Sequence, residues 1–115
     1  MITQIKGKLV EKNPTQVVVD CNGIGYEINI SLYTFSSLSS DENIKLFTHL
    51  QVREDAHILY GFFSVLERAV FRLLISVSGI GTSTARTMLS SLTPVEIQQA
   101  IGTEDVATIQ GVKGI

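Results

Sequence analysis

The chain has 115 residues, a net charge of −2 and a hydrophobic content of 44%. This size allows one ordinary domain or two small ones with a packed core, and the acidic balance argues against a strongly basic nucleic-acid binder. The single cysteine, Cys21, excludes an intrachain disulfide and a cysteine-rich metal site. No apolar run approaches the roughly 18 to 20 residues of a membrane span, and none resembles a signal peptide, so we expect a mature cytoplasmic protein with no membrane partner.

Residues 1 to about 62 alternate between apolar and polar side chains, which is the pattern of β-strands. Gly7 inside the first strand suggests a bulge or a strong bend. Asn13-Pro14 is a turn signal, and Asn22-Gly23 predicts a two-residue hairpin because both residues tolerate positive φ. A serine-rich segment at 31–43 is expected to hold a short helical turn. The first three strands are predicted at 2–10, 15–21 and 25–30.

Two alternating runs within residues 44–62 flank a short charged break, so they predict a β-hairpin with Glu54 and Asp55 at its tip. Paired carboxylates can bind a metal or serve as general acid and base. No third carboxylate or histidine has an evident reason to converge there, and His57 is expected to be solvated. We therefore predict no catalytic residue, no metal ligand and no cofactor; a solvated acidic turn is the ordinary alternative. His49 is expected on the polar face of its strand.

Five strands with a helical insert after the third are typical of a small closed OB-type barrel, with half of a β-sandwich as the competing interpretation. At Ser64 the period of the apolar residues changes from 2 to 3.6, which indicates a helical region. The predicted organisation is therefore β + α in two small domains, a barrel at 1–63 and a helical domain at 64–115. The barrel domain has five basic and seven acidic residues and hence a charge of −2, whereas the helical domain is neutral.

Capping signals indicate where the helices begin. Ser64-Val65-Leu66-Glu67 is a capping box at the head of a broadly apolar helix, which needs cover from the barrel, from later helices or from another subunit. Arg68 and Arg72 are expected on the solvated face of that helix. Thr82 is expected to cap a second helix, and Thr93-Pro94-Val95-Glu96 is a second capping box that starts a third.

Gly79-Ile80-Gly81, between the first two helices, completes a helix-hairpin-helix motif. The backbone amides of Gly81, Thr82, Ser83 and Thr84 would lie at a helix N-terminus, where the amides and the helix dipole favour a phosphate. Because backbone donors do not read bases, such binding would be independent of DNA sequence. A helix–helix turn without a ligand is the alternative.

Val112-Lys113-Gly114-Ile115 is similar to the start of a second such turn, which makes Lys113 and Gly114 further candidates for DNA binding. A simple turn is the alternative. Two such hairpins would grip phosphates on both sides of a duplex groove, whereas these residues hold at most one complete hairpin.

The chain resembles the RuvA family, the Holliday-junction-binding subunits of bacterial branch-migration complexes, over essentially all of its length. The most specific run is Val52-Arg53-Glu54-Asp55-Ala56 followed by Leu59-Tyr60-Gly61-Phe62. The resemblance rests further on Met1-Ile2, Lys6-Gly7, Gly23-Ile24-Gly25-Tyr26-Glu27, Phe47-Thr48-His49, Glu67-Arg68 and Gly79-Ile80-Gly81.

The resemblance implies an OB-fold domain, a domain with two helix-hairpin-helix motifs, and a third, motor-docking domain that these residues lack. It implies a non-enzymatic accessory subunit of an ATP-dependent DNA helicase complex, acting in recombination, repair and the SOS response, with ATP used by the partner motor. Family members form homotetramers, sometimes paired face to face, on four-way junction DNA, with a RuvB-type ATPase and a RuvC-type resolvase as partners. A chain ending inside the second hairpin is expected to bind DNA weakly and not to recruit the motor.

Individual residues take their family roles from the same resemblance. Glu54 and Asp55 match the acidic pin at the centre of the tetramer. Gly79 and Gly81 match the first DNA-binding hairpin, and Lys113-Gly114-Ile115 matches the start of the second.

One departure and two other function classes remain. Ser83 stands where many family members carry a lysine, so a cationic phosphate contact is expected to be missing. A general single-strand or structure-tolerant OB-fold binder would need exposed aromatic residues, for which Tyr26, Tyr33 and Tyr60 are the candidates. A repair glycosylase would need a catalytic Lys or Asp soon after a hairpin, and residues 82–91 contain neither.

Overall fold

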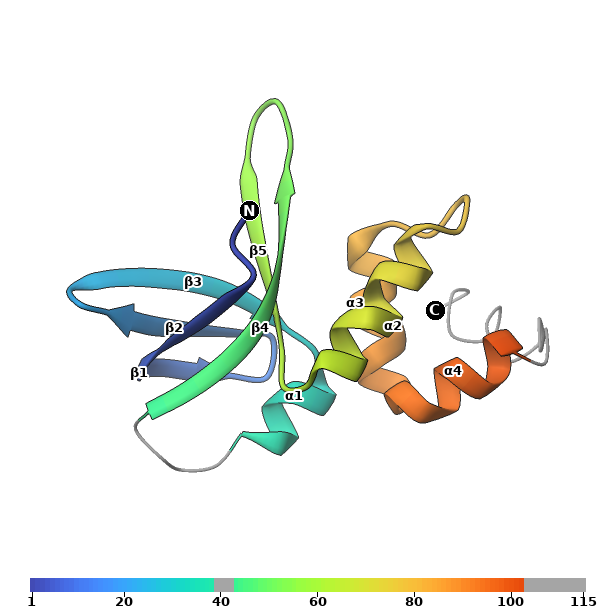
Figure 1. Ribbon diagram of the computed structural model, residues 1–115, viewed down its shortest axis with the longest axis horizontal. Coiled ribbons are helices and arrows are strands. Elements are labelled where there is room, and N and C mark those ends of the chain that lie inside the picture. The colour runs from blue at the N-terminus through green and yellow to red at the C-terminus, as the bar shows by residue number, and fades with distance from the viewer. Residues whose placement is uncertain (39–42, 103–115) are drawn as a thin grey trace.

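Five strands close into a barrel in the order β1-β2-β3-β5-β4, and helices follow it in the chain (Figure 1). The computed structural model describes residues 1–38 and 43–102. Its elements are β1 (Gln4–Asn13), β2 (Gln16–Cys21), β3 (Ile24–Ile30), α1 (Leu32–Ser37), β4 (Asn43–Val52), β5 (His57–Phe62), α2 (Val65–Ile75), α3 (Thr82–Ser91) and α4 (Pro94–Gly102). The predicted barrel, with a helical insert after its third strand and helices behind it, is confirmed, and the sandwich is wrong.

The barrel closes through one parallel pair, in which Asn29 and Ile30 of β3 lie opposite Tyr60 and Gly61 of β5. All other neighbouring strands are antiparallel. The predicted two-residue hairpin between β2 and β3 is confirmed, since Asn22 and Gly23 both have positive φ, 53° and 93°. Residues 53–56 connect the antiparallel strands β4 and β5, which form one long hairpin.

The first strand is irregular, although not at the residue expected. The pairing of β1 with β2 shifts between Leu9 and Glu11, so the bulge lies at Val10 rather than at Gly7. Gly7 instead allows close approach of two strands, because a Cβ atom there would overlap the carbonyl oxygen of Asp20. Glycine inside a strand is typical of a bulge or of a close approach by another backbone, and the structure shows that Gly7 allows the close approach.

Strand β5 separates two hydrophobic cores, because its side chains alternate between them. Leu59 faces the barrel interior, whereas Tyr60 and Phe62 face α2. The barrel core consists of Ile5, Val17, Val19, Ile28, Ile30, Leu38, Ile44, Leu46 and Leu59. The second core consists of Tyr60, Phe62, Val70, Phe71, Leu74, Ile80, Ala85, Met88, Leu89 and Ile97. The hairpin β4–β5 is therefore shared by the barrel and the helices.

The helix starts differ in how their caps are made. Thr93 and Glu96 form the predicted reciprocal capping box of α4, with each side chain accepting the other's backbone N–H at 3.2 and 3.1 Å. At α2, Ser64 Oγ accepts from the N–H of Glu67 as predicted, but the Glu67 carboxylate does not return to Ser64. Thr82 does not cap α3: Gly81 occupies that position, without a side-chain cap.

The carboxylate of Glu67 is completely buried where the barrel meets α2. It accepts hydrogen bonds from Ser31 Oγ, at 2.5 Å, from Thr34 Oγ1 and from the backbone N–H of Phe63, at 3.1 Å. Burial raises the pKa of Glu67 above its ordinary value, and the three hydrogen bonds oppose that rise. The Glu67 network thus holds the end of β5, the start of α2 and the insert α1 together.

The other face of α2 also contacts the barrel, which corrects two expectations. Arg68 donates to the carbonyl oxygen of Thr3 at 2.7 Å, and Arg72 Nε donates to His49 Nδ1 at 3.3 Å. His49 is half-buried, with its ring 5.5 Å from that of Phe71. Burial and the neighbouring arginines lower the pKa of His49. His49 and Arg68 are therefore half-buried at the barrel–helix interface, whereas Arg72 is exposed as expected and bonds to His49 from the solvated side. No helix among the described residues has the length and apolar character that a membrane span requires.

Candidate nucleic-acid interface

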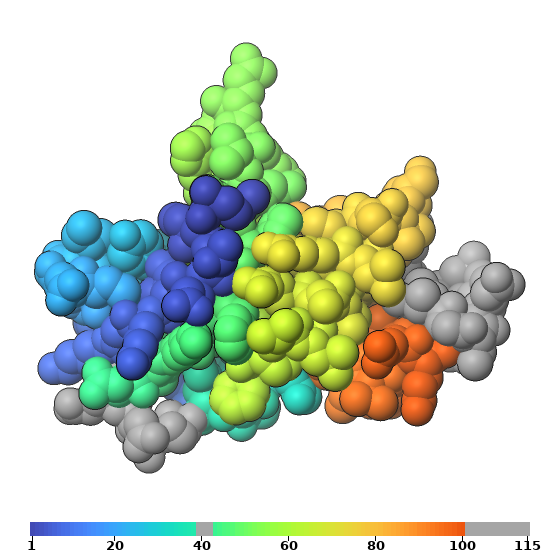
Figure 2. Space-filling view, viewed as in Figure 1, coloured from blue at the N-terminus to red at the C-terminus, as the bar shows by residue number. Residues whose placement is uncertain are grey.

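The acidic residues Glu54 and Asp55 occupy the tip of the β4–β5 hairpin. The backbone N–H of Arg53 donates to the carbonyl oxygen of Ala56 at 2.7 Å and closes the turn. Both carboxylates are exposed, as is Val52 at the end of β4. Figures 1 and 2 show this tip standing clear of the barrel and of the helices. The tip therefore presents two negative charges at the end of a narrow projection.

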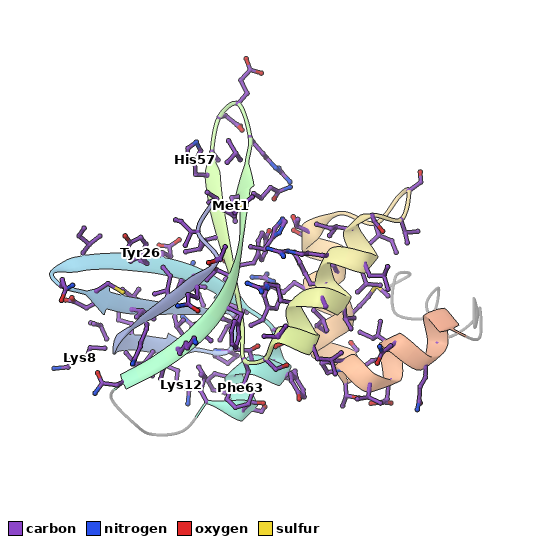
Figure 3. All side chains as sticks on the ribbon, viewed as in Figure 1. Met1, Lys8, Lys12, Tyr26, His57 and Phe63 are labelled. Atoms are coloured by element: carbon purple, nitrogen blue, oxygen red, sulfur yellow. The ribbon has the colours of Figure 1, made fainter. Side chains whose placement is uncertain are left out.

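No chemistry beyond charge is evident at this tip. His57 is exposed, and Figure 3 shows it on the side of the hairpin away from the helices. Among residues 1–38 and 43–102, no three His, Cys, Asp or Glu side chains lie close enough to hold a metal ion. The exposed position of both carboxylates is compatible with an electrostatic role, which stays a prediction.

The turn between α2 and α3 contains the second candidate element. Gly79 has a φ of 86°, a conformation that a glycine adopts without strain. Ile80 is buried in the second core and its N–H donates to the carbonyl oxygen of Val77 at 3.1 Å. The side chain of Ile80 thus anchors the turn, and only its backbone could face a ligand.

Gly81 has no role in the fold that requires a glycine. Its φ of −91° suits any residue, and a Cβ atom built on it would meet nothing within 4 Å. The absence of a side chain there keeps open space in front of the first turn of α3. Such space permits the close approach of another molecule's backbone.

The N-terminus of α3 differs from those of the other described helices. Side chains cap α1, α2 and α4, through Ser31, Ser64 and Thr93, whereas no side-chain hydrogen bond caps α3. An uncapped helix N-terminus presents backbone N–H groups and the positive end of the dipole. The feature matches the phosphate site expected at residues 81–84, although DNA binding by these residues stays a prediction.

The structure places the remaining candidates of this motif differently. Ser83 is exposed and Thr84 is half-buried on the first turn of α3. Thr82 is buried, and its hydroxyl bonds to Tyr60 Oη and Gln51 Oε1, each at 3.0 Å. Lys113 and Gly114, with the second hairpin, lie outside the described residues.

The two elements project from the same side of the molecule. In Figure 1, the β4–β5 tip and the α2–α3 turn both point toward the top of the view. Figure 2 shows the same two projections, with a lower-lying surface between them. The carboxylates and the exposed start of α3 could therefore face one extended ligand together.

The three candidate tyrosines differ in how far they could stack on single-stranded nucleic acid. Tyr60 is 5% exposed, and its ring packs 5.2 Å from that of Phe71. Tyr26 and Tyr33 are half-buried, and Tyr26 packs against the barrel core. Since stacking needs exposed ring faces, Tyr60 gives the single-strand interpretation no support.

Sequence reasoning did not single out Gln51 or Glu67 as parts of this arrangement. Gln51 lies two positions from His49 on the face of β4 toward the helices and reaches Thr82, 31 positions later. Glu67 looked like an ordinary capping-box residue. The position of Glu67 at the expected boundary between the two domains was the one available signal for the Glu67 network.

Comparisons with known proteins agree with the geometry. Residues 1–61 match the family model of the RuvA N terminal domain, and residues 71–115 match that of the SAM-like helix-hairpin-helix tandem. The chain is 66% identical, over all 115 residues, to the Holliday junction branch migration complex subunit RuvA of Christiangramia forsetii. Identity to the proteins of that name from Flavobacterium psychrophilum and Cytophaga hutchinsonii is 60% and 54%, again over the whole chain. The chain spans 60%, 60% and 58% of the lengths of these three relatives.

Proposed function

This chain belongs to the RuvA family, and we propose on that premise that it is a non-catalytic, DNA-binding part of a subunit that recognises four-way junctions. The observation that carries the proposal is the common direction of the acidic tip and of the uncapped α3 N-terminus (Figure 1). One element repels DNA backbone and the other attracts it, so together they favour a DNA of particular shape.

The attractive element is the start of α3, at residues 81–84. Backbone N–H groups bind a phosphate without reading bases, so contact is independent of sequence. Gly81 leaves room for the DNA backbone to approach. Ser83 adds no positive charge, so each contact is weaker than it would be beside a lysine.

The repulsive element depends on assembly. We propose that four copies surround one axis, which brings eight carboxylates, from Glu54 and Asp55 of each copy, to the centre of the DNA-binding face. Screening confines their repulsion to about 8 Å at physiological salt. A continuous duplex would have to cross that centre, whereas an open junction leaves it clear. Specificity then arises partly from a penalty on the wrong ligand.

An exposed apolar face on α2 supports assembly from identical copies. Leu66, Ala69 and Leu73 recur at helical spacing on α2, Val77 continues the spacing just beyond the helix, and all four residues are exposed. Leu73 is 46% exposed, although neighbours on the opposite face, such as Leu74, are fully buried. A contiguous apolar strip of this kind is typical of an interaction surface. Copies related by rotation can cover it through a repeated contact that closes into a ring.

The names of the relatives support a proposal about partners. Each is named a subunit of a branch migration complex, so we propose that the whole subunit works with an ATP-driven, RuvB-type motor and a RuvC-type resolvase in the bacterial cytoplasm. The residues of this chain hold the junction arms apart, and the motor uses the ATP. No bond is made or broken at the acidic tip.

Titration of the 115-residue chain with a four-way junction, a duplex and a single strand tests the proposal. Tightest binding to the junction is expected. Tighter binding to the single strand would favour a general OB-fold binder instead.

A glycine variant tests the attractive element separately. In Gly81→Ala, the added methyl group would occupy the open space in front of α3 and keep a phosphate away from the backbone N–H groups. A hydrogen bond to a charged group contributes about 1.5–3 kcal/mol, so the loss of one such bond is expected to weaken binding to junction and duplex alike by at least about tenfold. Gly25→Ala is the matched control, since its Cβ would make only an ordinary 3.6 Å contact with Val18. Unchanged affinity in Gly81→Ala would show that the N-terminus of α3 does not bind DNA phosphate.

A further inference from the structure

A buried chain of hydrogen bonds connects the hairpin that bears the acidic tip to the first residue of α3. Tyr60 Oη donates to Thr82 Oγ1 at 3.0 Å, and Thr82 Oγ1 donates to Gln51 Oε1 at 3.0 Å. Tyr60 lies on β5 and Gln51 on β4. These three residues, the Tyr60–Thr82–Gln51 relay, therefore join both strands of the hairpin to the helix.

The chemistry of the three side chains determines which group donates and which accepts in each hydrogen bond of the relay. The amide oxygen of Gln51 has no proton, so the Thr82 hydroxyl must donate to it. The Thr82 oxygen is then free to accept from Tyr60. Tyr60 and Thr82 are both buried residues, at 5% and 4% exposed. Loss of the Thr82 hydroxyl would leave the buried Tyr60 hydroxyl without its acceptor, which destabilises a protein more than the loss of both partners together.

Thr82 makes this contact instead of the one its position suggests. A threonine at a helix start often caps the helix through its hydroxyl. Here the hydroxyl points to the hairpin, and the first turn of α3 has no side-chain cap. The same residue thus leaves the helix N–H groups exposed and fixes the helix to β4 and β5.

Within residues 1–38 and 43–102, the relay is the hydrogen-bonded contact between the hairpin and the helices that lies nearest the tip. Gln51 is half-buried, whereas Val52 is 61% exposed and both Glu54 and Asp55 are exposed. Glu54 follows Gln51 by three residues, and an extended chain of that length spans roughly 10 Å. A rotation of the hairpin at Gln51 would therefore displace the carboxylates at the tip more than the relay residues themselves.

We propose that the Tyr60–Thr82–Gln51 relay is a positioning device that fixes the separation between the acidic tip and the phosphate-binding start of α3. Its effect on DNA choice rests on the function proposed above. Repulsion fades over about 8 Å in physiological salt, so movement of the tip by a few ångströms changes which DNA backbones it excludes. The relay therefore sets the preference for junction over duplex, although no relay side chain needs to touch DNA.

Distance measurement between spin labels tests the positioning directly. Labels on Arg53→Cys and Ser78→Cys report on the two projections, and both positions are exposed. The background carries Cys21→Ser, which removes the native thiol and keeps a donor for the carbonyl oxygen of Lys6. Tyr60→Phe and Thr82→Val each delete one hydroxyl with little change in shape.

Ser90→Ala is the matched control. It also deletes a hydroxyl of α3 that bonds to another element, since Ser90 Oγ accepts from the N–H of Leu32, but that contact is at α1, away from the hairpin. A broader distance distribution is expected in Tyr60→Phe and in Thr82→Val, and the parent distribution in Ser90→Ala. Because the relay acts as a unit, the double variant is expected to broaden no more than the single variants.

DNA binding by the unlabelled variants provides the second readout. The ratio of junction to duplex affinity is expected to fall about fivefold in Tyr60→Phe, the factor that corresponds to one lost hydrogen bond of about 1 kcal/mol, and to stay unchanged in Ser90→Ala. A distance distribution as narrow as the parent's would overturn the positioning role. Broadening without a change in the affinity ratio would overturn its effect on specificity. A parent without junction preference would refute the proposed function, while the label distances would still decide whether the relay positions the tip.

Discussion

Replacement of Glu67 tests whether burial or hydrogen bonding has the larger effect on the pKa of this carboxyl, which lies at the barrel–helix junction. Glu67→Ala removes the acceptor for the buried hydroxyls of Ser31 and Thr34. The N–H of Phe63 keeps Thr34 Oγ1 as a second acceptor at 3.1 Å. Two stranded donors cost about 1–3 kcal/mol each, or roughly 2–6 kcal/mol, against about 5–15 kcal/mol for a whole domain. The alanine variant should therefore be severely destabilised.

Glu67→Gln is the more informative change because it keeps the shape and one acceptor oxygen but cannot ionise. Its cost should be about 1–3 kcal/mol, since one of the two hydroxyls loses a carboxylate acceptor. The ordinary pKa of the Glu67 carboxyl is 4.5, and burial raises it in the folded protein. A raised folded pKa means that the folded state binds the proton more tightly than the unfolded state. The stabilisation this provides is complete below the ordinary pKa and is lost as the pH rises through the folded value.

The assay is the free energy of unfolding in urea, measured across the acid range for the parent and for Glu67→Gln. The advantage of the parent over the variant should shrink as the pH rises above about 4.5, with a slope of at most about 1.4 kcal/mol per pH unit. An advantage that grows with pH would refute the reasoning, because it would mean that the hydrogen bonds outweigh burial. A flat difference would show no net shift in the pKa of Glu67.

Three further changes probe the barrel, the interface and the assembly. Gly61→Ala places a Cβ atom 2.5 Å from Ile28 Cγ2 and should cost about 1–3 kcal/mol in urea unfolding; an unchanged midpoint would show that the barrel yields freely. Burial and the charge of Arg72 lower the pKa of His49, so the stability that the neutral imidazole contributes is present above pH 6.5 and is lost as the pH falls. His49→Gln should remove this pH dependence of the free energy of unfolding, and the same pH profile in variant and parent would contradict the reasoning. If the proposed tetramer forms through the apolar face of α2, Leu73→Glu should give smaller species in light scattering, and an unchanged mass would place the subunit contact elsewhere.

Local patterns were sufficient to predict the elements of this fold. Asn22-Gly23 has the backbone that its turn requires, and Thr93 with Glu96 makes the reciprocal cap expected from four adjacent residues. These features depend on neighbours within a few positions, so the sequence contains everything that determines them. The placement of Glu54 and Asp55 at a hairpin tip follows from the same short-range alternation.

The partners of the polar side chains could not be predicted in this way. Ser31 and Thr34 lie 36 and 33 positions from Glu67, and Tyr60 lies 22 positions from Thr82. A capping motif in the sequence indicates that a side chain can bond to its own helix, but not whether a distant group bonds to that side chain instead. The side chains of Glu67 and Thr82 bond to distant groups, whereas Thr93 caps its own helix.

The central claim is that the acidic tip penalises continuous duplex. Glu54→Gln with Asp55→Asn removes both charges, and Glu11→Gln with Glu27→Gln removes the same charge from exposed positions on the barrel strands. The decisive measurement is the ratio of junction to duplex affinity for the two double variants at one salt concentration. The account predicts tighter duplex binding and a reduced ratio for the tip variant, and the parent ratio for the control. An unchanged ratio in the tip variant, or an equal change in both variants, would contradict the account.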